Sequence, residues 1–181
     1  TENVKTAQSF YERALLDGAE GVMVKNLKGI YKPGSRVGFG LKMKPVMESL
    51  DLTIVGAEWG TGKRANWLSS FTLACRDGDN FLEIGKMGTG LKEKESGGLS
   101  FSQLTKLLKG NILSKNGRTV EIKPNVIIEV EYEEIQKSPT YSSGFALRFP
   151  RVLRLREDLS LADVDNLKKV TSLKTGQRGR K

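Results

Sequence analysis

Apolar and polar residues alternate along most of the chain after residue 49, which is the pattern of half-buried β-strands. Within residues 126–132, Val126, Ile128 and Val130 fall on one face, whereas Glu129 falls on the other. Five further stretches alternate in this way or form short apolar runs bounded by turn residues. They are residues 51–59, 67–76, 81–87, 119–123 and 147–155. The pattern predicts a mainly β structure for this part of the chain.

Three segments instead repeat apolar positions every three or four residues, as amphipathic helices do. Residues 6–17 end at Gly18, residues 100–109 end at Gly110, and a last helix opens at Ser160 with a capping-box pattern. The second helix falls between predicted strands. These elements together predict a mainly β fold with some α: a small, closed or partly closed barrel of the oligonucleotide-binding type, with an inserted helix and a C-terminal helix.

Two short alternating segments precede this region. The first, residues 20–25, is predicted to be a short strand, and taken alone it fits an ordinary core strand with charged ends. In the second, the pleat places Lys42 and Lys44 on one face and directs Leu41 and Met43 inward. Two neighbouring ammonium groups repel each other unless an anion lies between them, so a phosphate contact is one interpretation. The alternative is that both lysines extend into water.

Residues 147–158 hold four arginines on what is predicted to be a strand interrupted by Pro150. After the proline, alternation directs Leu153 and Leu155 toward a core and Arg154 and Arg156 outward together. Guanidinium groups stay charged and bind phosphate oxygens through paired hydrogen bonds. The segment therefore suits a phosphate-rich partner, although a solvated basic strand fits the same pattern.

Composition narrows the classes of function. The 181 residues carry a formal charge of +9, which favours a polyanionic partner. Six of these charges lie in residues 168–181, so the remainder carries only about +3. Cys75 is the single cysteine and histidine is absent, so a disulfide within the chain is excluded and a zinc site is not expected. No apolar run reaches the ~20 residues of a membrane span. We expect a reducing, intracellular location.

Several segments in order resemble the carboxyl-terminal part of ATP-dependent DNA ligases of the archaeal and eukaryotic replicative type. The resemblance extends over about residues 8–170 and is most specific in Val120–Pro124, Glu129–Tyr132, Ile135–Tyr141 and Ser143–Arg151. Residues 20–25 resemble the fourth nucleotidyltransferase motif, residues 41–44 the fifth and the arginine strand the sixth. The resemblance implies that residues 1–48 end an adenylation domain and that residues 49–181 form an oligonucleotide-binding barrel with a basic tail.

The resemblance also implies roles for individual residues, with ATP and Mg²⁺ as cofactors of the complete enzyme. Glu20 would help to hold the metal ion. Lys42 and Lys44 would contact the adenylate α-phosphate, and Arg36 and Lys25 would line the nucleotide site. Arg156 and Asp158 would orient the departing pyrophosphate. Cations and metal ions would act by neutralising charge on the phosphates during phosphoryl transfer.

The sequence departs from the family pattern at three places. Leu159 stands where the sixth motif usually has a lysine, and Gly40 stands where the family often has tryptophan. The nucleophilic motif Lys-x-Asp-Gly is absent; the similar Asp77-Gly78 pair follows Cys75-Arg76. The chain opens on a threonine, so we expect a piece of a longer protein whose nucleophile lies upstream. This chain alone is not expected to form a lysyl-AMP.

The implied activity of the complete protein is the sealing of nicks in duplex DNA through enzyme-AMP and DNA-adenylate intermediates, in replication, repair and recombination. Candidate partners are nicked duplex DNA, the upstream DNA-binding and adenylation domains of the same protein, and a sliding clamp; no membrane is expected. The compartment would be the cytoplasm in an archaeon or the nucleus in a eukaryote. The expected DNA contacts are Lys63, Arg64, Lys86, Lys92, Arg148, Arg151 and Arg154.

Two other functions remain open at this point. One is a stand-alone barrel that binds nucleic acid without catalysis, for which exposed aromatic side chains would serve as stacking platforms. Aromatic residues make up only 7%, and Trp59, Trp67 and Phe71 also fit core positions. The other is an RNA ligase or a capping-type nucleotidyltransferase, which shares the last three motifs in looser form.

Overall fold

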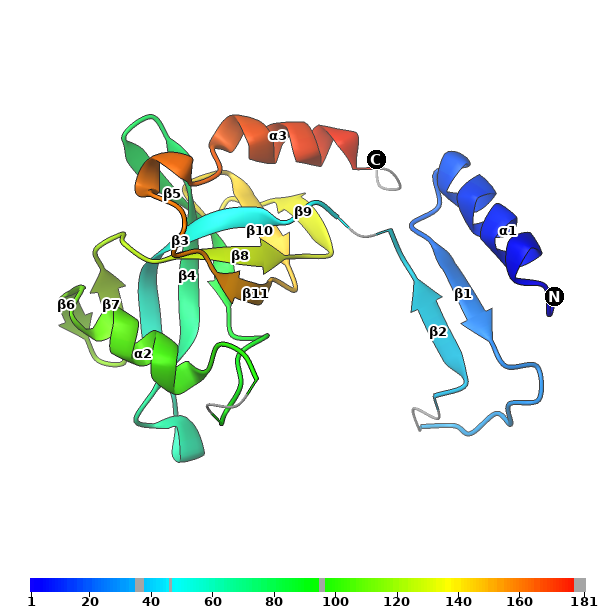
Figure 1. Ribbon diagram of the computed structural model, residues 1–181, viewed down its shortest axis with the longest axis horizontal. Coiled ribbons are helices and arrows are strands. Elements are labelled where there is room, and N and C mark those ends of the chain that lie inside the picture. Colours follow the sequence, from blue (N-terminus) through cyan, green and yellow to red (C-terminus); the bar gives the residue numbers. More distant parts are fainter. Residues whose placement is uncertain (35–37, 46, 95–96, 178–181) are drawn as a thin grey trace. The chain divides into compact units, whose positions relative to one another are not determined.

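The computed structural model describes residues 1–34, 38–45, 47–94 and 97–177. The chain divides into two compact units, one formed by Thr1–Val46 with Gly176–Lys181 and the other by Met47–Thr175. Each unit is described separately below, with the elements labelled as in Figure 1.

The first unit contains helix α1 (Val4–Leu16) and an antiparallel ribbon of β1 (Val22–Lys25) and β2 (Gly40–Met43). Asn3 caps α1 by accepting a hydrogen bond from the backbone N–H of Thr6. At the base of the ribbon, Gly21 has a φ of 147°. Any Cβ at Gly21 would overlap the carbonyl oxygen of Met43, so the close approach of the two strands requires glycine here.

The ribbon corrects one prediction about side-chain direction. Leu41 and Met43 were expected to point into a core, but they are 68% and 40% exposed. The reason is that none of the described residues between 1 and 45 is buried, so this unit offers no interior to receive them. The alternation itself is present. Met23 and Lys42 are paired on one face of the ribbon, and their neighbours Val24 and Leu41 are paired on the other.

The second unit is built on five strands: β3 (Leu50–Trp59), β4 (Leu68–Asp77), β5 (Asn80–Met87), β8 (Ile127–Glu131) and β11 (Arg151–Leu155). Their order in the sheet is β11-β8-β3-β4-β5. The two outer strands meet just beyond β5, where the N–H of Val152 donates to the carbonyl of Thr89 at 3.1 Å. This order, with its nearly closed edge, is that of a partly open oligonucleotide-binding barrel, as the sequence predicted.

The interior of the barrel is apolar and continuous. The alternating strands supply most of it, and Cys75 is buried within it rather than exposed. Trp59 and Trp67 pack against the same core, and Phe71 is fully buried in it. The largest fully buried side chains are Phe71, Phe101, Leu50, Leu52, Ile54, Leu68, Leu73, Ile84, Met87, Leu104, Leu108 and Ile122. Burial of this set is the main force that holds the barrel together.

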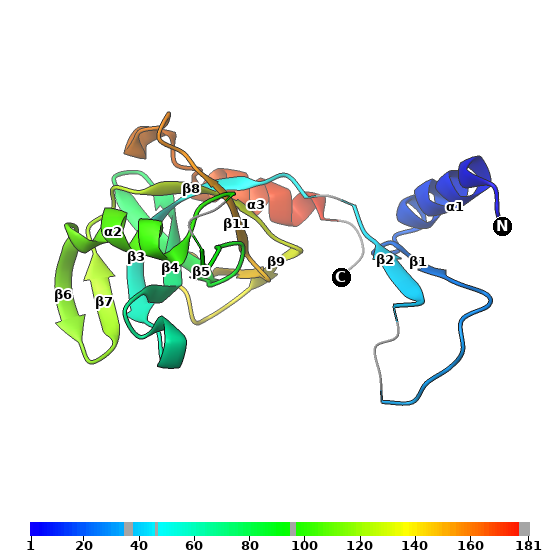
Figure 2. The same cartoon turned by 60° about the horizontal axis from the view of Figure 1, so that its bottom comes forward.

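The inserted helix α2 (Phe101–Lys109) lies between β5 and β8 in the chain, as predicted. Ser100 and Gln103 form a full capping box at its start. Helix α2 is joined to β4 by the hydroxyl of Thr105, which accepts from the N–H of Leu68 at 3.0 Å. Figures 1 and 2 show the helix beside the hairpin of β6 (Ile112–Asn116) and β7 (Thr119–Ile122).

A second hairpin, of β9 (Glu134–Lys137) and β10 (Phe145–Arg148), precedes the arginine strand. The alternation pattern did not predict strands at β6 or β9. The predicted helix after Ser160 also begins later than expected. Asp163 accepts two hydrogen bonds from Ser160, but this pair closes only a 3₁₀ turn (Leu161–Asp163), and α3 itself spans Leu167–Gly176.

The arginine strand β11 differs from the prediction because its pairing with β8 shifts between Val152 and Arg154. This irregularity interrupts the two-residue period. Val152 is therefore buried and Leu153 is 48% exposed, whereas alternation had placed Leu153 in the core. Arg154 points outward as expected, and Arg156 lies on the same side of the sheet, where it binds Asp51, the register partner of Glu129. The side chain of Arg156 is nevertheless only 15% exposed, because Asp51 and Asp158 enclose it.

Candidate functional site

Two lysines, Lys25 and Lys42, share one face of the ribbon in the first unit, and Lys44 directly follows the ribbon. Met23 lies opposite Lys42 in the register, and Lys25 lies two residues further along β1. Lys44 follows β2 directly, two residues beyond Lys42, and all three lysines are exposed. A phosphate group fits this face, because its negative charge would relieve the repulsion between the ammonium groups. Arg36, the other expected nucleotide contact, lies outside the described residues.

The carboxylate of Glu20 lies just before β1 and is exposed. Within the part of the chain that the structure describes, no group of three His, Cys, Asp or Glu side chains could hold a metal ion. These residues therefore do not form a metal site on their own, since divalent cations in proteins take several oxygen ligands. At most, Glu20 can supply one ligand among others from outside this set.

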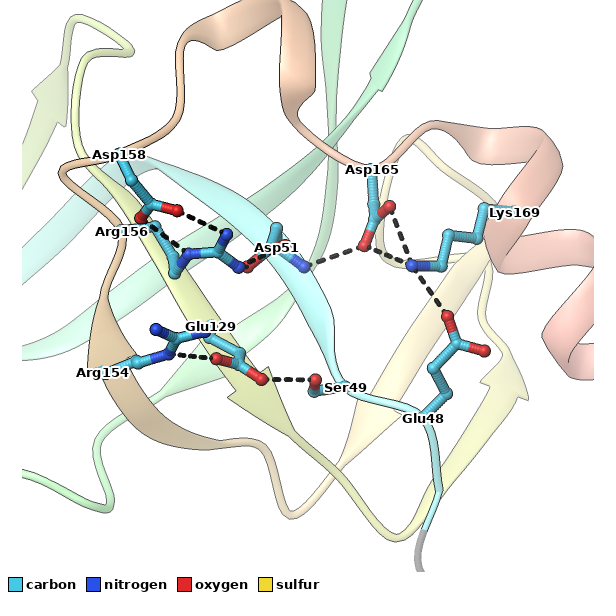
Figure 3. Close-up of polar contacts among 9 residues, drawn as sticks. All are labelled: Glu48, Ser49, Asp51, Glu129, Arg154, Arg156, Asp158, Asp165 and Lys169. Carbon is cyan, nitrogen blue, oxygen red and sulfur yellow. Dashed lines mark hydrogen bonds and ion pairs between the residues drawn. The ribbon is translucent and has the colours of Figure 1, made fainter.

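Arg156 is the most enclosed of the predicted site residues, and two carboxylates hold it in place (Figure 3). Its Nη1 donates to both oxygens of Asp51 at 2.8 Å. Its Nε and Nη2 donate to the two oxygens of Asp158 at 2.9 and 2.8 Å. Hydrogen bonding to Arg156 lowers the pKa of Asp158 to about 2. Burial raises the pKa of Asp51, although the guanidinium opposes that shift.

Local sequence patterns could not identify Asp51 as a partner of Arg156, because 105 positions separate the two residues. Asp51 lies in β3 and reaches Arg156 across β8, the strand that separates β3 from β11 in the sheet. A polar residue at the start of an otherwise apolar strand was the one available signal. Asp51 fixes the direction of the Arg156 side chain, so we add it to the candidate site as a positioning residue.

The same contacts extend from Arg156 to the C-terminal helix (Figure 3). The backbone N–H of Asp51 donates to Asp165, whose carboxylate also binds the ammonium group of Lys169 at 3.1 Å. Lys169, on α3, in turn binds Glu48 at 2.9 Å. Burial lowers the pKa of Lys169, but its hydrogen bonds to Glu48 and Asp165 outweigh burial and raise the pKa overall. The helix, the start of β3 and Arg156 therefore form one connected group.

The other arginines of the strand region also face carboxylates. Each lies directly opposite a glutamate in the strand register. The N···O distances are 2.6 Å for Arg154–Glu129, 3.5 Å for Arg151–Glu131 and 3.5 Å for Arg148–Glu134. The predicted DNA-binding arginines are thus partly neutralised in this structure.

The four remaining predicted DNA contacts lie elsewhere on the barrel unit. Lys63 and Arg64 belong to a 3₁₀ turn (Gly62–Arg64) between β3 and β4. Arg64 pairs with Glu93 at 2.6 Å, and its guanidinium lies 4.6 Å from the centre of the Phe101 ring. Lys86 on β5 pairs with Glu58 at 2.6 Å, and Lys92 is exposed in the segment after β5. Lys63 is exposed as well.

Phe149 is a candidate that the sequence did not single out. Its side chain is 65% exposed, and its φ of 50° is the only positive value at a described non-glycine residue. The guanidinium of Arg148 lies 5.2 Å from the centre of its ring. Strained backbone conformations concentrate at functional sites, and an exposed aromatic ring is suited to contact with bases or apolar surfaces. No sequence pattern indicated this conformation, since a residue before proline usually adopts an extended one.

The strand order and the inserted helix define an oligonucleotide-binding barrel, and solved structures support this fold. The ligase domain of LigD from M. tuberculosis aligns with a TM-score of 0.54 and 24% identity, over 87% of this chain and 50% of that one. Pmar-Lig_PreS3 aligns with a TM-score of 0.59 and 22% identity, over 86% of this chain and 32% of that one. At these identities the likeness concerns the fold.

The chain belongs to the ATP-dependent DNA ligase family. Residues 64–159 match the family described as "ATP dependent DNA ligase C terminal region", and residues 1–44 match "ATP dependent DNA ligase domain". The DNA ligase of Nanoarchaeum equitans is 51% identical over 97% of this chain and 32% of its own length. That of Thermococcus fumicolans is 47% identical over 96% of this chain and 30% of its own length. The chain thus spans about a third of these curated relatives.

Proposed function

We propose that this chain is the C-terminal part of an enzyme that seals nicks in duplex DNA at the expense of ATP. The observation that carries the proposal is the match of two ligase family models to consecutive parts of the chain, residues 1–44 and 64–159. Relatives at about half identity over nearly the whole chain are DNA ligases. Such an enzyme would act on DNA inside the cell, and a sliding clamp stays a prediction from sequence.

In this proposal, the ribbon binds the phosphates of the nucleotide. ATP, when bound, supplies the adenylyl group. Lys25 and Lys42, from one face of β1 and β2, and Lys44, directly after β2, bind the phosphates and lower the cost of charge that develops there. Glu20 contributes one ligand to a divalent cation, Mg²⁺ in the proposal, but no step here depends on that ion.

Arg156 and Asp158 form the second phosphate-directed group, on the barrel. The guanidinium is oriented by Asp51 and Asp158 before any ligand binds, so little conformational freedom is lost when it meets a pyrophosphate. Such pre-orientation is what a charge-stabilising group requires. The family pattern usually has a lysine at the position of Leu159. Without that lysine, Arg156 is the cation that we assign to the pyrophosphate. The motif Lys-x-Asp-Gly, which would hold the nucleophilic lysine, does not occur in this chain. We therefore predict that the chain alone cannot charge itself with AMP.

The barrel's role is to hold duplex DNA through its sugar-phosphate backbone. The contact residues that we propose are Lys63, Arg64, Lys86, Lys92, Arg148, Arg151 and Arg154, with Phe149 beside them. Backbone contacts of this kind give binding that depends little on sequence and strongly on salt. Trp59, Trp67 and Phe71, which a single-strand stacking protein would expose, instead pack in or against the core. That placement disfavours a stand-alone single-strand binder.

The test compares binding of the chain to a nicked duplex and to a single strand of the same length, by fluorescence anisotropy at several salt concentrations. The nicked duplex should bind more tightly. Replacing Lys63 and Arg64 with alanine should make the slope of log K against log salt shallower by about 2, because each lost phosphate contact removes roughly 0.9 from the slope.

The matched control removes two lysines outside the proposed contacts, with Lys109→Ala and Lys115→Ala. It lowers the net charge by the same amount but should leave the slope nearly unchanged. Equal binding to single strands and nicked duplex would contradict the proposed function and favour a general nucleic-acid-binding module. An unchanged slope in the Lys63/Arg64 variant would remove that turn from the DNA-contact set.

A further inference from the structure

The arginines of the β10–β11 region form a regular ladder with glutamates of β8 and β9. Three arginines stand directly opposite three glutamates in the strand register, two in the β8–β11 pair and one in the β9–β10 pair. Each opposite pair is also an ion pair. We call this set the arginine–glutamate ladder; its members are Arg148–Glu134, Arg151–Glu131 and Arg154–Glu129.

We propose that the ladder glutamates compete with DNA phosphates for the ladder arginines. On binding, each arginine exchanges its glutamate for a phosphate, and on release the glutamate takes the arginine back. The inference rests on the proposed function, because it concerns the DNA-binding surface named there. In this proposal, Glu129, Glu131 and Glu134 lower the affinity for DNA and so speed its release.

The exposure of the side chains supports exchange rather than permanent pairing. In every pair, the arginine is more exposed than its glutamate: 62% against 18% for Arg154–Glu129, and 59% against 45% for Arg151–Glu131. The third pair, with Arg148, follows the same order at 39% against 19%. A phosphate group can therefore approach the guanidinium groups from the solvent while the carboxylates stay nearer the sheet.

The carboxylates also remain stabilised once the arginines leave. Glu129 accepts a hydrogen bond from the hydroxyl of Ser49 at 2.6 Å, and that contact lowers its pKa together with Arg154. Glu134 accepts from the side chain of Gln136 at 3.0 Å. The side chain of Glu131 is 45% exposed and is available to water. No buried charge is left without a partner, so the exchange avoids the large cost of breaking a buried ion pair.

The strengths of the three contacts predict a ranking of effects. The Arg154–Glu129 pair is a short, charge-assisted hydrogen bond at 2.6 Å, whereas the Arg151–Glu131 pair is a looser contact at 3.5 Å. Competition from Glu129 should therefore restrict DNA binding more than competition from Glu131. A purely structural ladder would show no such relation to DNA affinity, because exposed pairs contribute little to folding stability.

The test measures binding of the whole chain to nicked duplex DNA across a range of salt concentrations, for the wild type and for Glu129→Gln and Glu131→Gln. Glutamine keeps the size of the side chain but removes its charge. We expect roughly two- to fivefold tighter binding for Glu129→Gln and a smaller gain for Glu131→Gln. The slope of log K against log salt should stay nearly unchanged, because Arg154 and Arg151 contact phosphate in the wild-type complex as well, and the gain should appear as slower dissociation of DNA.

The matched control is Glu121→Gln on β7, which makes the same charge change at an exposed glutamate paired with Ser114 rather than with arginine. It should change affinity by much less than Glu129→Gln, with an unchanged slope. In the double variant Glu129→Gln/Arg154→Gln, the gain should disappear. Thermal unfolding of each variant separates these effects from loss of folding.

Two outcomes distinguish the ladder from the proposed function. If the wild type binds nicked duplex DNA and Glu129→Gln binds no more tightly than Glu121→Gln, the competition is overturned while the proposed function stands. If neither the wild type nor any variant prefers nicked duplex DNA, the proposed function fails, and the ladder proposal fails with it.

Discussion

At the residue scale, Phe149 combines a left-handed backbone conformation with an exposed ring. A side chain in this conformation costs about 1–2 kcal/mol, whereas glycine adopts it freely. We therefore predict that Phe149→Gly is more stable than Phe149→Ala by about 1 kcal/mol, which reverses the usual order of these two residues. Urea denaturation of both variants, followed by circular dichroism, measures the difference.

Leu153 provides the control for this prediction, because it is also exposed and lies four residues away without a positive φ. There, Leu153→Ala should be more stable than Leu153→Gly by about 0.5–1 kcal/mol. Equal stability of the two Phe149 variants, or the normal order, would show that the backbone at Phe149 carries no strain. The reversal would identify a residue held in an unfavourable conformation, as functional contacts often are.

The residue scale also shows what the sequence could and could not predict about the site. Alternation is a local property, so it was enough to predict the strand that carries Lys42, and β2 is present with Lys42 paired to Met23, whereas the shared face of Lys42 and Lys44 stays a prediction. The contact between Arg156 and Asp51 depends on the neighbours that the barrel brings together across 105 positions. The low exposure of Arg156 depends on its contacts with Asp51 and Asp158, and the exposure of Leu153 depends on a strand irregularity that no residue type indicates.

At the element scale, the long barrel strands that were predicted correctly are those with a strongly apolar face. β3, β4 and β8 bury alternate or successive residues, so their pattern carries the signal. β6 buries none of its residues and is held by pairing with β7, which leaves no hydrophobic period to detect. β9 buries only Ile135, and a single buried position gives no period to detect. Hydrogen-bonded edge elements therefore escaped prediction for a physical reason.

Helix α3 yields a prediction at this scale, because Val170 is its only buried residue. Because few apolar contacts hold α3, we infer that the ion pairs from Lys169 to Glu48 and Asp165 contribute to the free energy that holds the helix on the barrel. Replacing Lys169 with methionine keeps the apolar stem and removes the charge, and it leaves the partly buried Asp165 without this cation. We expect a loss of about 1 kcal/mol in the free energy of unfolding, measured by thermal denaturation.

The matched control for Lys169 is its neighbour Lys168, which is exposed and loses the same charge in Lys168→Met. That variant should unfold within about 0.5 kcal/mol of the wild type, as surface substitutions usually do. If both variants unfold alike, the contacts of Lys169 do not anchor α3. The pair of measurements thus tells whether the helix is held by these specific ion pairs or by its apolar side alone.

At the scale of the whole molecule, the two units differ in how they can be stabilised. The barrel unit has a continuous core, in which strands far apart in sequence bury their apolar faces together. None of the described residues between 1 and 45 is buried, and Phe10, Leu16, Tyr31 and Leu41 are 66–87% exposed. In the described part of the chain, no helix is long and apolar enough to cross a membrane.

This difference leads to a prediction for amide hydrogen exchange of the chain in solution. Helix α1 has 13 residues and the ribbon has two strands, and isolated elements of that size are marginal in water. Their amides should exchange within seconds, whereas those of β3, β4 and β8 should be protected by a factor of about 10³ or more, since they open only with the core. Peptides from the barrel serve as the internal reference in mass spectrometry. Slow exchange across Val4–Leu16 would contradict the prediction and show that the first unit is held by contacts of its own.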